Sequence, residues 1–352
     1  MTILVTGGAG YIGSHLVLAL VRSGERVVVL DDLSTGHRHA VAPEARLIEG
    51  DAGDRALLGE VLRNDAIEAI FHLAGSVVVP ESLADPLGYY ANNTLASHAL
   101  FAEAVAAGVA HVVFSSTAAV YGAARDTEVD EEAPLAPITP YGASKMMSER
   151  ILFDTARAHP LTAIALRYFN VAGADPGGAL GQSTAGATHL IKRAVQAALG
   201  QGAVLEIYGQ DYPTRDGTCI RDYIHVSDLA EAHLAALAAL RRGRTSTVYN
   251  CGYGRGVSVL EVVAAVERVT GQRLPVVRGA RRAGDPPALI AKAERLRTET
   301  GWRPHHDDLD AIVAGALAWE RRLSASPGLP ESTGESTGGS LAHHAAIAET
   351  AV

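Results

Sequence analysis

The residues with the clearest chemical potential in this sequence are Thr117, Tyr141 and Lys145. Tyr141 and Lys145 stand four positions apart, which places them on one face of a helix. A phenol has a pKa of about 10, and a nearby ammonium lowers that pKa by favouring the phenolate. Tyr141 is therefore a candidate base for a substrate hydroxyl whose carbon loses a hydride, and Thr117 is a candidate to position that hydroxyl. A surface Tyr–Lys pair is the alternative interpretation of the spacing.

The start of the chain, MTILVTGGAGYIGS, offers a binding site for a hydride acceptor. The apolar run Ile3–Val5 predicts a strand buried on both faces, and Tyr11–Val21 predicts a helix. Between them, three glycines follow a Gly-x-x-Gly-x-x-Gly spacing: Gly7, Gly10 and Gly13. A strand, a glycine turn and a helix N-terminus together present backbone N–H groups to a pyrophosphate. A simple turn is the alternative explanation for the glycines.

An acid follows the glycines at the distance that a dinucleotide site requires. Val27–Leu30 predicts a second buried strand, and Asp31 ends it about 20 residues after the glycines. A carboxylate there accepts hydrogen bonds from a ribose 2′-OH and repels a 2′-phosphate, and Asp32 adds to the repulsion. We therefore expect NAD and not NADP. A helix cap or a turn cap is the alternative role for the two acids.

Strands and helices alternate through the first half of the chain. Strands are expected at 46–49, 67–73 and 112–114, the last running into Ser115, Ser116 and Thr117, and helices at 84–108 and from Tyr141 onward. Alternation of this kind predicts an α/β fold with a Rossmann-type, doubly wound parallel sheet. Ligands bind at the carboxyl ends of such strands, where Asp31, Asp51, Gly75 and Thr117 fall. Asp51 is expected to reach the adenine or to be a solvated loop acid.

Composition excludes several classes of protein. The chain has 352 residues, 48% of them hydrophobic, and a formal charge of −9. The absence of a basic stripe argues against a nucleic-acid partner. With only Cys219 and Cys251, no disulfide framework is expected, and a reduced cytoplasmic setting is the simple interpretation. We find no signal peptide, no apolar run that spans a bilayer and no metal-ligand spacing.

Eight stretches resemble the extended short-chain dehydrogenase/reductase superfamily and, within it, the UDP-glucose 4-epimerases (UDP-galactose 4-epimerases). They cover roughly Met1 to Leu323 and are VTGGAGYIGSH (5–15), LDDLSTGH (30–37), PESLADPLGYYANN (80–93), FSSTAAVYG (114–122), PYGASK (140–145), LRYFNVAGADP (166–176), YPTRDGTCIRDYIHVSDLAEAH (212–233) and RRAGDPPAL (281–289). The glycine and Tyr/Lys motifs mark the superfamily only. The stretches containing YFNVAGADP and RDGTCIRDYIHV are much more specific.

The resemblance implies how the chain is divided. It implies an NAD-binding domain over residues 1–170 and a smaller α/β domain over 171–323 that mainly binds the UDP-sugar, with some chain crossing back. Residues 324–352 begin with a Pro-, Gly-, Ser- and Thr-rich run that predicts a disordered tail. A homodimer through the helices 84–108 and 141–158 is also implied.

The resemblance also assigns site residues. The catalytic residues are Thr117, Tyr141 and Lys145. The NAD-binding residues are Gly7, Gly10, Tyr11, Ile12, Gly13, Asp31, Asp32, Asp51, Ala52, Leu73, Ala74, Gly75, Asn92, Ser115, Tyr141, Lys145 and Tyr168. The substrate-binding residues are Thr117, Tyr141, Asn170, His189, Leu190, Tyr208, Arg221, Arg282 and Asp285.

Within the substrate site, the resemblance implies that Arg221 and Arg282 clamp the diphosphate, where a guanidinium fork suits phosphate oxygens. Asp285 holds a ribose hydroxyl and Tyr208 lies against the uracil. Taken without the resemblance, the arginines are ordinary surface residues and Asn170 is a turn residue.

Further elements are expected in the second half of the chain. One strand is expected to end at Asn170 and another to cover 205–208, and helices are expected at 188–199 and 227–240. Loops are expected at 172–186 and at the acidic run 130–132, which is expected to be solvated.

The sequence departs from well-known epimerases at four positions. Thr117 stands where many have Ser and keeps the hydroxyl, whereas Val77 stands where some have a Lys that contacts NAD. His189 replaces an Asn that touches the UDP-sugar in some members. Leu289 lies where the side-chain size is linked to tolerance of N-acetylated sugars, so that tolerance is left open.

The residues after Thr117 favour one reaction. Superfamily dehydratases carry Asp-Glu there for the additional acid–base chemistry, whereas this chain has Ala118 and Ala119. We therefore expect UDP-glucose and UDP-galactose to be interconverted through oxidation at C4, rotation of a bound 4-keto sugar and hydride return. Two alternatives remain: 4-epimerisation of another UDP-sugar (an N-acetylhexosamine, pentose or uronic acid), and a non-catalytic NAD-binding sensor.

Overall fold

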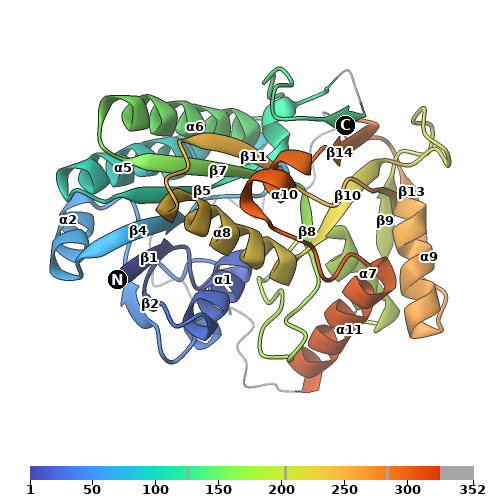
Figure 1. The fold of residues 1–352 in the computed structure, drawn as a ribbon. Coiled ribbons are helices and arrows are strands. Elements are labelled where there is room, and N and C mark those ends of the chain that lie inside the picture. Colours follow the sequence, from blue (N-terminus) through green and yellow to red (C-terminus); the bar gives the residue numbers. More distant parts are fainter. Residues whose placement is uncertain (125–126, 202–203, 283–284, 326–352) are drawn as a thin grey trace.

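The large sheet of the computed structural model is parallel throughout and has seven strands (Figure 1). The structure describes residues 1–124, 127–201, 204–282 and 285–325. The strand order is β11-β7-β5-β4-β1-β2-β3. The strands are β1 Thr2–Thr6, β2 Arg26–Asp31, β3 Arg46–Glu49, β4 Ile67–His72, β5 His111–Thr117, β7 Thr162–Tyr168 and β11 Thr247–Cys251. The order reverses between β1 and β4, so the carboxyl ends of these two strands flank the crevice where such sheets bind ligands.

Helices cover both faces of the large sheet (Figure 1). The helices α1 (Tyr11–Arg22), α8 (Val226–Arg241) and α10 (Glu294–Thr300) pack on one face, whereas α2 (Arg55–Asn64), α5 (Ala96–Ala106) and α6 (Pro140–Ala158) pack on the other. Successive residues of β1 serve the two cores in turn: Ile3 and Val5 face α1, and Leu4 faces α2. This burial on both faces confirms the prediction from the apolar run.

The predicted continuous helix over 84–108 is wrong. The chain forms α3 (Val79–Ala84), α4 (Pro86–Tyr89) and a π-helical segment (Tyr90–Leu95) before α5 begins. Pro86 lacks the N–H that would continue α3, and the Asp85 carboxylate accepts a hydrogen bond from the Gly88 N–H at 2.9 Å. The π-helical segment turns Asn93 into the protein, where its side chain is buried.

A second, smaller sheet and a two-stranded sheet lie beyond the end of the large sheet (Figure 1). The smaller sheet contains β6 Glu128–Val129, β8 Asn170–Ala172, β10 Ile220–His225, β12 Gly256–Ser258 and β14 Ala288–Ala291, and the pair contains β9 Leu205–Tyr208 and β13 Val276–Gly279. Three helices, α7 (Leu190–Ala198), α9 (Val259–Thr270) and α11 (Leu309–Ala325), form one core with β8, β9, β10, β12 and β13.

The strand expected to end at Asn170 is two strands. β7 ends at Tyr168 in the large sheet, and Asn170 begins β8, which pairs with β10 in the smaller sheet. Phe169 lies between them and is buried in a separate apolar cluster. Asn170 therefore stands where the chain crosses from one sheet to the other.

The two halves of the chain exchange elements. β11 comes from the second half and joins the large sheet, and α8 and α10, also from the second half, pack on one of its faces. β6 comes from the first half and pairs with β14 in the smaller sheet, an exchange that was not expected. Helix α11 continues through Ala325, and the remainder of the expected tail, 326–352, lies outside the described residues.

The expected solvated loop over 130–132 is wrong at its centre. Asp130 and Glu132 are exposed, but Glu131 is only 7% exposed. Its carboxylate accepts a hydrogen bond from the Asn250 N–H at 2.9 Å, and the Asn250 amide donates to the Val129 carbonyl at 2.9 Å. Glu131 therefore joins the segment after β6 to the edge strand β11.

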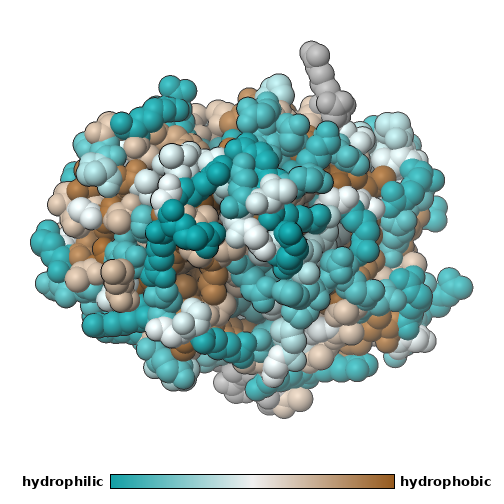
Figure 2. Space-filling view, viewed as in Figure 1, coloured by the Kyte–Doolittle hydropathy of each residue, from teal (hydrophilic) through white to brown (hydrophobic). Residues whose placement is uncertain are grey.

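Hydrophilic side chains cover most of the face seen in Figure 2, with smaller hydrophobic areas between them. Within the described ranges, no helix has both the length and the apolar character that crossing a membrane would need.

Candidate active site

Helix α6 places Tyr141 and Lys145 in its first two turns. Pro140 occupies the first helical turn, where its missing N–H costs nothing, and the Thr139 hydroxyl accepts a hydrogen bond from the Gly142 N–H at 3.2 Å. Both Tyr141 and Lys145 are buried, and only 2% of Lys145 is exposed. The expected start of the helix at Tyr141 is therefore confirmed to within one residue.

The end of β5 meets these two residues. Lys145 donates from Nζ to the Ser115 carbonyl oxygen at 3.1 Å, and its ammonium lies 5.1 Å from the centroid of the Phe114 ring. Thr117 is the last residue of β5, and its Oγ1 accepts from the Ala119 N–H at 3.1 Å. The Thr117 O–H therefore remains available to donate. The structure thus brings the three predicted catalytic residues to one strand end.

The expected lowering of the Tyr141 pKa by Lys145 is not found in the protein alone. Burial raises the pKa of Tyr141, because the phenolate loses its hydration, and only the Thr117 side chain opposes this. Lys145 directs its ammonium at the Ser115 carbonyl, and burial lowers its own pKa to about 8. Glu149, one turn further along α6, opposes that fall.

Tyr168 completes this group. Its hydroxyl shares a hydrogen bond with the Ser115 hydroxyl, and the negative charge that Tyr141 gains as a phenolate contributes to raising the pKa of Tyr168, although burial is the main cause. The predicted residues Ser115, Tyr141 and Tyr168 are therefore neighbours.

Gly75 follows β4 and lies next to Lys145. It has φ +147°, and a Cβ atom there would lie 2.7 Å from Asn93 Oδ1 and 3.5 Å from Lys145 Nζ. Asn93 holds this loop: its Oδ1 accepts from the Ser76 N–H at 2.8 Å, and its Nδ2 donates to the Ser144 hydroxyl at 3.0 Å. A side chain at position 75 would therefore collide with the Asn93 amide that holds this loop.

Asn93 was missed by the sequence reasoning, which named Asn92. Asn92 is exposed and donates to the Ser76 hydroxyl at 2.8 Å. Its neighbour Asn93 is the buried residue that ties the loop after β4 to α6. The pairing depends on the π-helical segment, which no pattern in the sequence predicted.

The glycine turn packs so closely on neighbouring backbone that a side chain on Gly7 or Gly13 would clash with it. A Cβ on Gly7, which has φ +72°, would lie 2.6 Å from the Ala74 nitrogen, and a Cβ on Gly13 would lie 2.0 Å from the Gly7 carbonyl oxygen. Gly10 directly precedes α1. The close packing of β1, the loop after β4 and the α1 N-terminus fits the pyrophosphate of a dinucleotide.

The acids after the glycines cap turns, which was the alternative role. Asp31 is buried, and its carboxylate accepts from the Ala9 N–H at 2.8 Å and the Leu33 N–H at 2.9 Å. Asp32 and Asp51 accept from the N–H groups two residues ahead. An ionised carboxylate offers about four acceptor positions, so Asp31 retains capacity for a ribose. Contacts of NAD with all the residues assigned to it, among them Ile12, Asp51, Ala52 and Leu73, stay predictions.

Two pairs of predicted substrate residues meet on the smaller domain. Arg221 in β10 donates to the Asp285 carboxylate at 3.2 Å. The Arg282 guanidinium lies 3.8 Å from the centroid of the Tyr208 ring. The two guanidinium groups can donate hydrogen bonds to phosphate oxygens, and the aromatic face of Tyr208 can pack against a base. Together they suit a nucleoside diphosphate.

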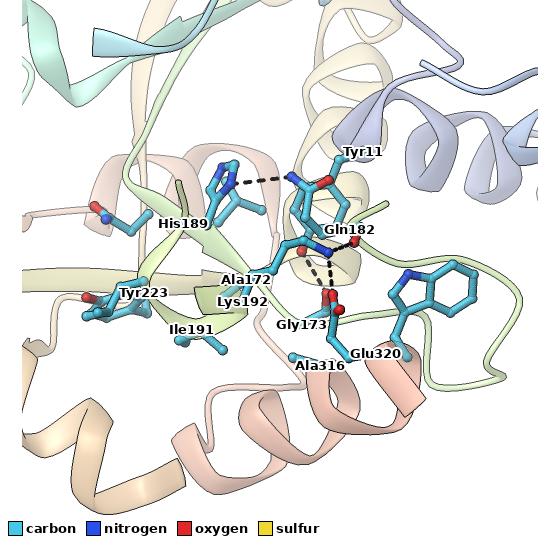
Figure 3. Close-up of a pocket in the computed structure, with 14 residues that line it drawn as sticks. Tyr11, Ala172, Gly173, Gln182, His189, Ile191, Lys192, Tyr223, Ala316 and Glu320 are labelled. Carbon is cyan, nitrogen blue, oxygen red and sulfur yellow. Dashed lines mark hydrogen bonds and ion pairs between the residues drawn. The ribbon is translucent and has the colours of Figure 1, made fainter. Parts of the chain in front are cut away.

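A pocket that is open to solvent lies between the glycine turn and the smaller domain (Figure 3). The predicted residues Asn170, His189 and Leu190 line it together with Tyr11, whose hydroxyl donates to the Gly173 carbonyl at 2.7 Å. Its described lining does not include the catalytic residues or the two arginines. The predicted substrate residues thus fall into two groups, one at this pocket and one around Arg221.

Leu289 lies in β14 and is buried in the cluster that contains Ala118, Tyr121 and Phe169. Ala118 directly follows Thr117, and Phe169 directly precedes Asn170. The side chain at position 289 therefore supports the wall behind residues from both halves of the site.

Comparisons with known proteins show which proteins this chain is similar to. The family model described as the NAD dependent epimerase/dehydratase family matches residues 3–252. A UDP-glucose 4-epimerase from Azospirillum brasilense is 56% identical over 326 residues, which are 93% of this chain and 94% of that protein.

Two solved structures extend the comparison. The UDP-glucose 4-epimerase from Brucella ovis in complex with NAD has a TM-score of 0.87 and 45% identity, over 90% of this chain and 97% of that chain. The UDP-Glc/GlcNAc 4-epimerase from Campylobacter jejuni has a TM-score of 0.80 and 44% identity, over 91% and 99% of the two chains.

Proposed function

The chain belongs to the NAD dependent epimerase/dehydratase family, and we propose that it interconverts UDP-glucose and UDP-galactose with NAD as its cofactor. The observation that carries the proposal is the meeting of Thr117, Tyr141 and Lys145 at the end of β5. Gly75, beside Lys145, connects this group to the crevice between β1 and β4.

Each residue of the group has a distinct role. Tyr141 takes the proton of the C4 hydroxyl and gives it back after the 4-keto sugar has rotated. Thr117 donates to the reacting oxygen and orients it, since its own Oγ1 is held by the Ala119 N–H. Lys145, anchored on the Ser115 carbonyl, holds a positive charge on the same face of α6. Bound NAD supplies the hydride acceptor and donor for C4, and its positive charge favours the phenolate.

The residues that follow Thr117 support epimerisation over dehydration. Ala118 and Ala119 carry no acid or base, and Ala118 packs into the apolar cluster with Leu289. Elimination of water from the sugar requires an added acid and base.

A second candidate substrate class is the N-acetylated UDP-hexosamines. The Campylobacter jejuni structure, 44% identical, is named as a UDP-Glc/GlcNAc 4-epimerase. Leu289 controls how much room the wall leaves, so the side chain at this position decides between the two classes.

We also propose a homodimer that works in the cytoplasm. Large apolar side chains on α4, the π-helical segment and α6 are exposed, including Leu87 at 78%, Leu95 at 65% and Met147 at 41%. These are the two regions expected to pair with a second copy. Cys219 and Cys251 are free thiols, which suits a reducing compartment.

The direct test is conversion of UDP-galactose by the purified protein without added NAD. The proposal predicts that UDP-glucose appears and that NAD is released when the protein is denatured. Protein that contains NAD but converts none of the UDP-sugars would support the sensor alternative, and conversion of another UDP-sugar alone would support the second substrate class.

A further inference from the structure

A glutamine and a histidine form a hydrogen-bonded pair in the wall of the pocket beside the glycine turn (Figure 3). Gln182 lies in the segment between β8 and α7 and is 8% exposed. Its Oε1 accepts from the Thr184 N–H at 2.9 Å, and its Nε2 lies 3.4 Å from Nδ1 of His189. No motif in the sequence pointed to Gln182.

The contact with Thr184 fixes which end of the amide faces the histidine. A backbone N–H only donates, so the atom that meets it is the amide oxygen. The NH₂ group, which also only donates, therefore faces Nδ1 of His189. Nδ1 must accept, and a neutral imidazole that accepts at Nδ1 carries its proton on Nε2.

The position of Gln182 is itself fixed by a buried ion pair. Lys192 donates from Nζ to the Gln182 carbonyl oxygen at 2.6 Å and also to the Glu320 carboxylate. Both partners of this pair are buried. Helices α7 and α11 thus hold the glutamine at its backbone, while Thr184 holds its side chain.

The surroundings favour a neutral imidazole. The His189 side chain is exposed, but the protein atoms packed around its ring, and after them the Lys192 ammonium, lower its pKa. Tyr11 from α1 lies edge-on to the ring with 6.2 Å between centroids, and its hydroxyl is committed to the Gly173 carbonyl. Glu320 from α11 is paired with Lys192. No described carboxylate is hydrogen-bonded to the His189 ring.

We propose that Gln182 is a positioning residue: it fixes His189 in the tautomer whose Nε2–H donates to an acceptor oxygen of the UDP-sugar. The proposal rests on the proposed function for the identity of that ligand. An asparagine at position 189 would present its amide N–H without such help, because an amide has no tautomer to choose. A histidine at this position needs a partner group that can donate but not accept a hydrogen bond at Nδ1, because such a partner keeps the ring proton on Nε2.

The proposal predicts that Gln182 matters only when residue 189 is a histidine. Gln182→Leu should raise KM for UDP-galactose about five- to tenfold, the effect of misplacing one hydrogen-bond donor, with kcat within about twofold. In a His189→Asn background, the same substitution should leave KM within about twofold. Equal increases in both backgrounds would show that Gln182 only supports the loop and would overturn the proposal.

A matched control is Gln196→Leu. The Gln196 amide lies on α7 and donates to the same Glu320 carboxylate at 3.4 Å, and within the described residues it makes no hydrogen bond to His189. This variant should leave KM unchanged. A rise equal to that of Gln182→Leu would assign the effect to the ion pair and contradict the proposal.

Nitrogen NMR of ¹⁵N-histidine-labelled protein reads the tautomer directly, without turnover. The signal that disappears in His189→Asn should show an unprotonated Nδ1 and a protonated Nε2, and it should move toward a tautomer mixture in Gln182→Leu. A protonated Nδ1 in the unaltered protein would refute the assignment. The tautomer result stands even if UDP-galactose is not converted, so failure of this inference is distinguishable from failure of the proposed function.

Discussion

Lys145 donates from Nζ to the carbonyl oxygen of Ser115 at 3.1 Å. One turn later in α6, Glu149 accepts from the hydroxyl of Ser116 and pairs with Arg167 of β7. Two neighbouring residues at the end of β5 thus hold two successive turns of the helix, and the geometry of the reaction centre depends on both contacts.

Breaking the buried Glu149–Arg167 pair should destabilise the protein. Both side chains are at most 5% exposed, so Glu149→Gln leaves a buried guanidinium without its counter-charge, at a cost of about 3 to 5 kcal/mol. The melting temperature measured by calorimetry should fall accordingly. Replacing both residues by Met should recover most of the loss, whereas a double variant as unstable as Glu149→Gln would contradict this explanation.

Gly75→Ala should weaken retention of NAD. The added methyl would meet Asn93 Oδ1 at 2.7 Å and crowd the side of the loop that faces Lys145. We expect NAD to be reduced at least fivefold in the purified variant, measured by absorbance and chromatography after denaturation. Gly24→Ala is the control, because Gly24 has φ +85° with open space around its Cβ position. Equal NAD loss in the control would assign the effect to backbone strain alone.

Stability should fall as the pH drops from about 6.5 to about 4, partly because of His233. Burial lowers the pKa of His233 to about 4, and its Nε2 has no hydrogen-bond partner in the described part of the chain. The unfolded chain, with a histidine pKa of about 6.5, binds a proton in this window that the folded protein does not, so acid favours unfolding. The effect is roughly 3 kcal/mol at most.

His233→Phe should therefore flatten the dependence of unfolding free energy on pH between about 6.5 and about 4. The ring lies among apolar neighbours such as Phe71, which suits a phenylalanine. Urea unfolding at several pH values measures the slope, and the exposed His159→Phe is the control. An unchanged slope in His233→Phe would mean that other groups carry the acid sensitivity.

Leu289→Ala should broaden the range of sugars. Removing the side chain opens the wall behind Ala118 and Phe169, and we expect kcat/KM for UDP-N-acetylgalactosamine to rise at least fivefold relative to UDP-galactose. Stability should fall by about 2 to 5 kcal/mol. Leu274→Ala, a similar truncation in the separate core around α9, should lose stability without changing the ratio. If both variants change the ratio of kcat/KM for the two sugars, the side chain at position 289 has no specific role in sugar selection.

The sequence predicted the large sheet well because burial on both faces leaves apolar runs such as Ile3–Val5. It also predicted which residues lie at the carboxyl ends of the strands, because those residues follow directly from where each strand lies in the sequence. The broken helix after Ala84 was visible in principle at Pro86, but the π-helical segment that buries Asn93 carries no local signal.

Other features depend on contacts far along the chain. Glu131 resembles a solvated acid until Asn250, 119 positions away, is brought to it. Lys192 meets Glu320 across 128 positions, and that pair places Gln182. The acidity of Tyr141 was predicted from its spacing to Lys145, but the direction of the ammonium is set by the fold.

In the proposed reaction, the buried phenol of Tyr141 moves the C4 proton of a UDP-hexose. The most direct measurement compares the protein with Tyr141→Phe, using UDP-galactose as substrate without added NAD and titrating UDP binding by calorimetry. The account predicts that the variant retains NAD and UDP affinity while kcat falls about 10²- to 10⁴-fold. A variant that converts UDP-galactose at the rate of the unaltered protein would contradict it.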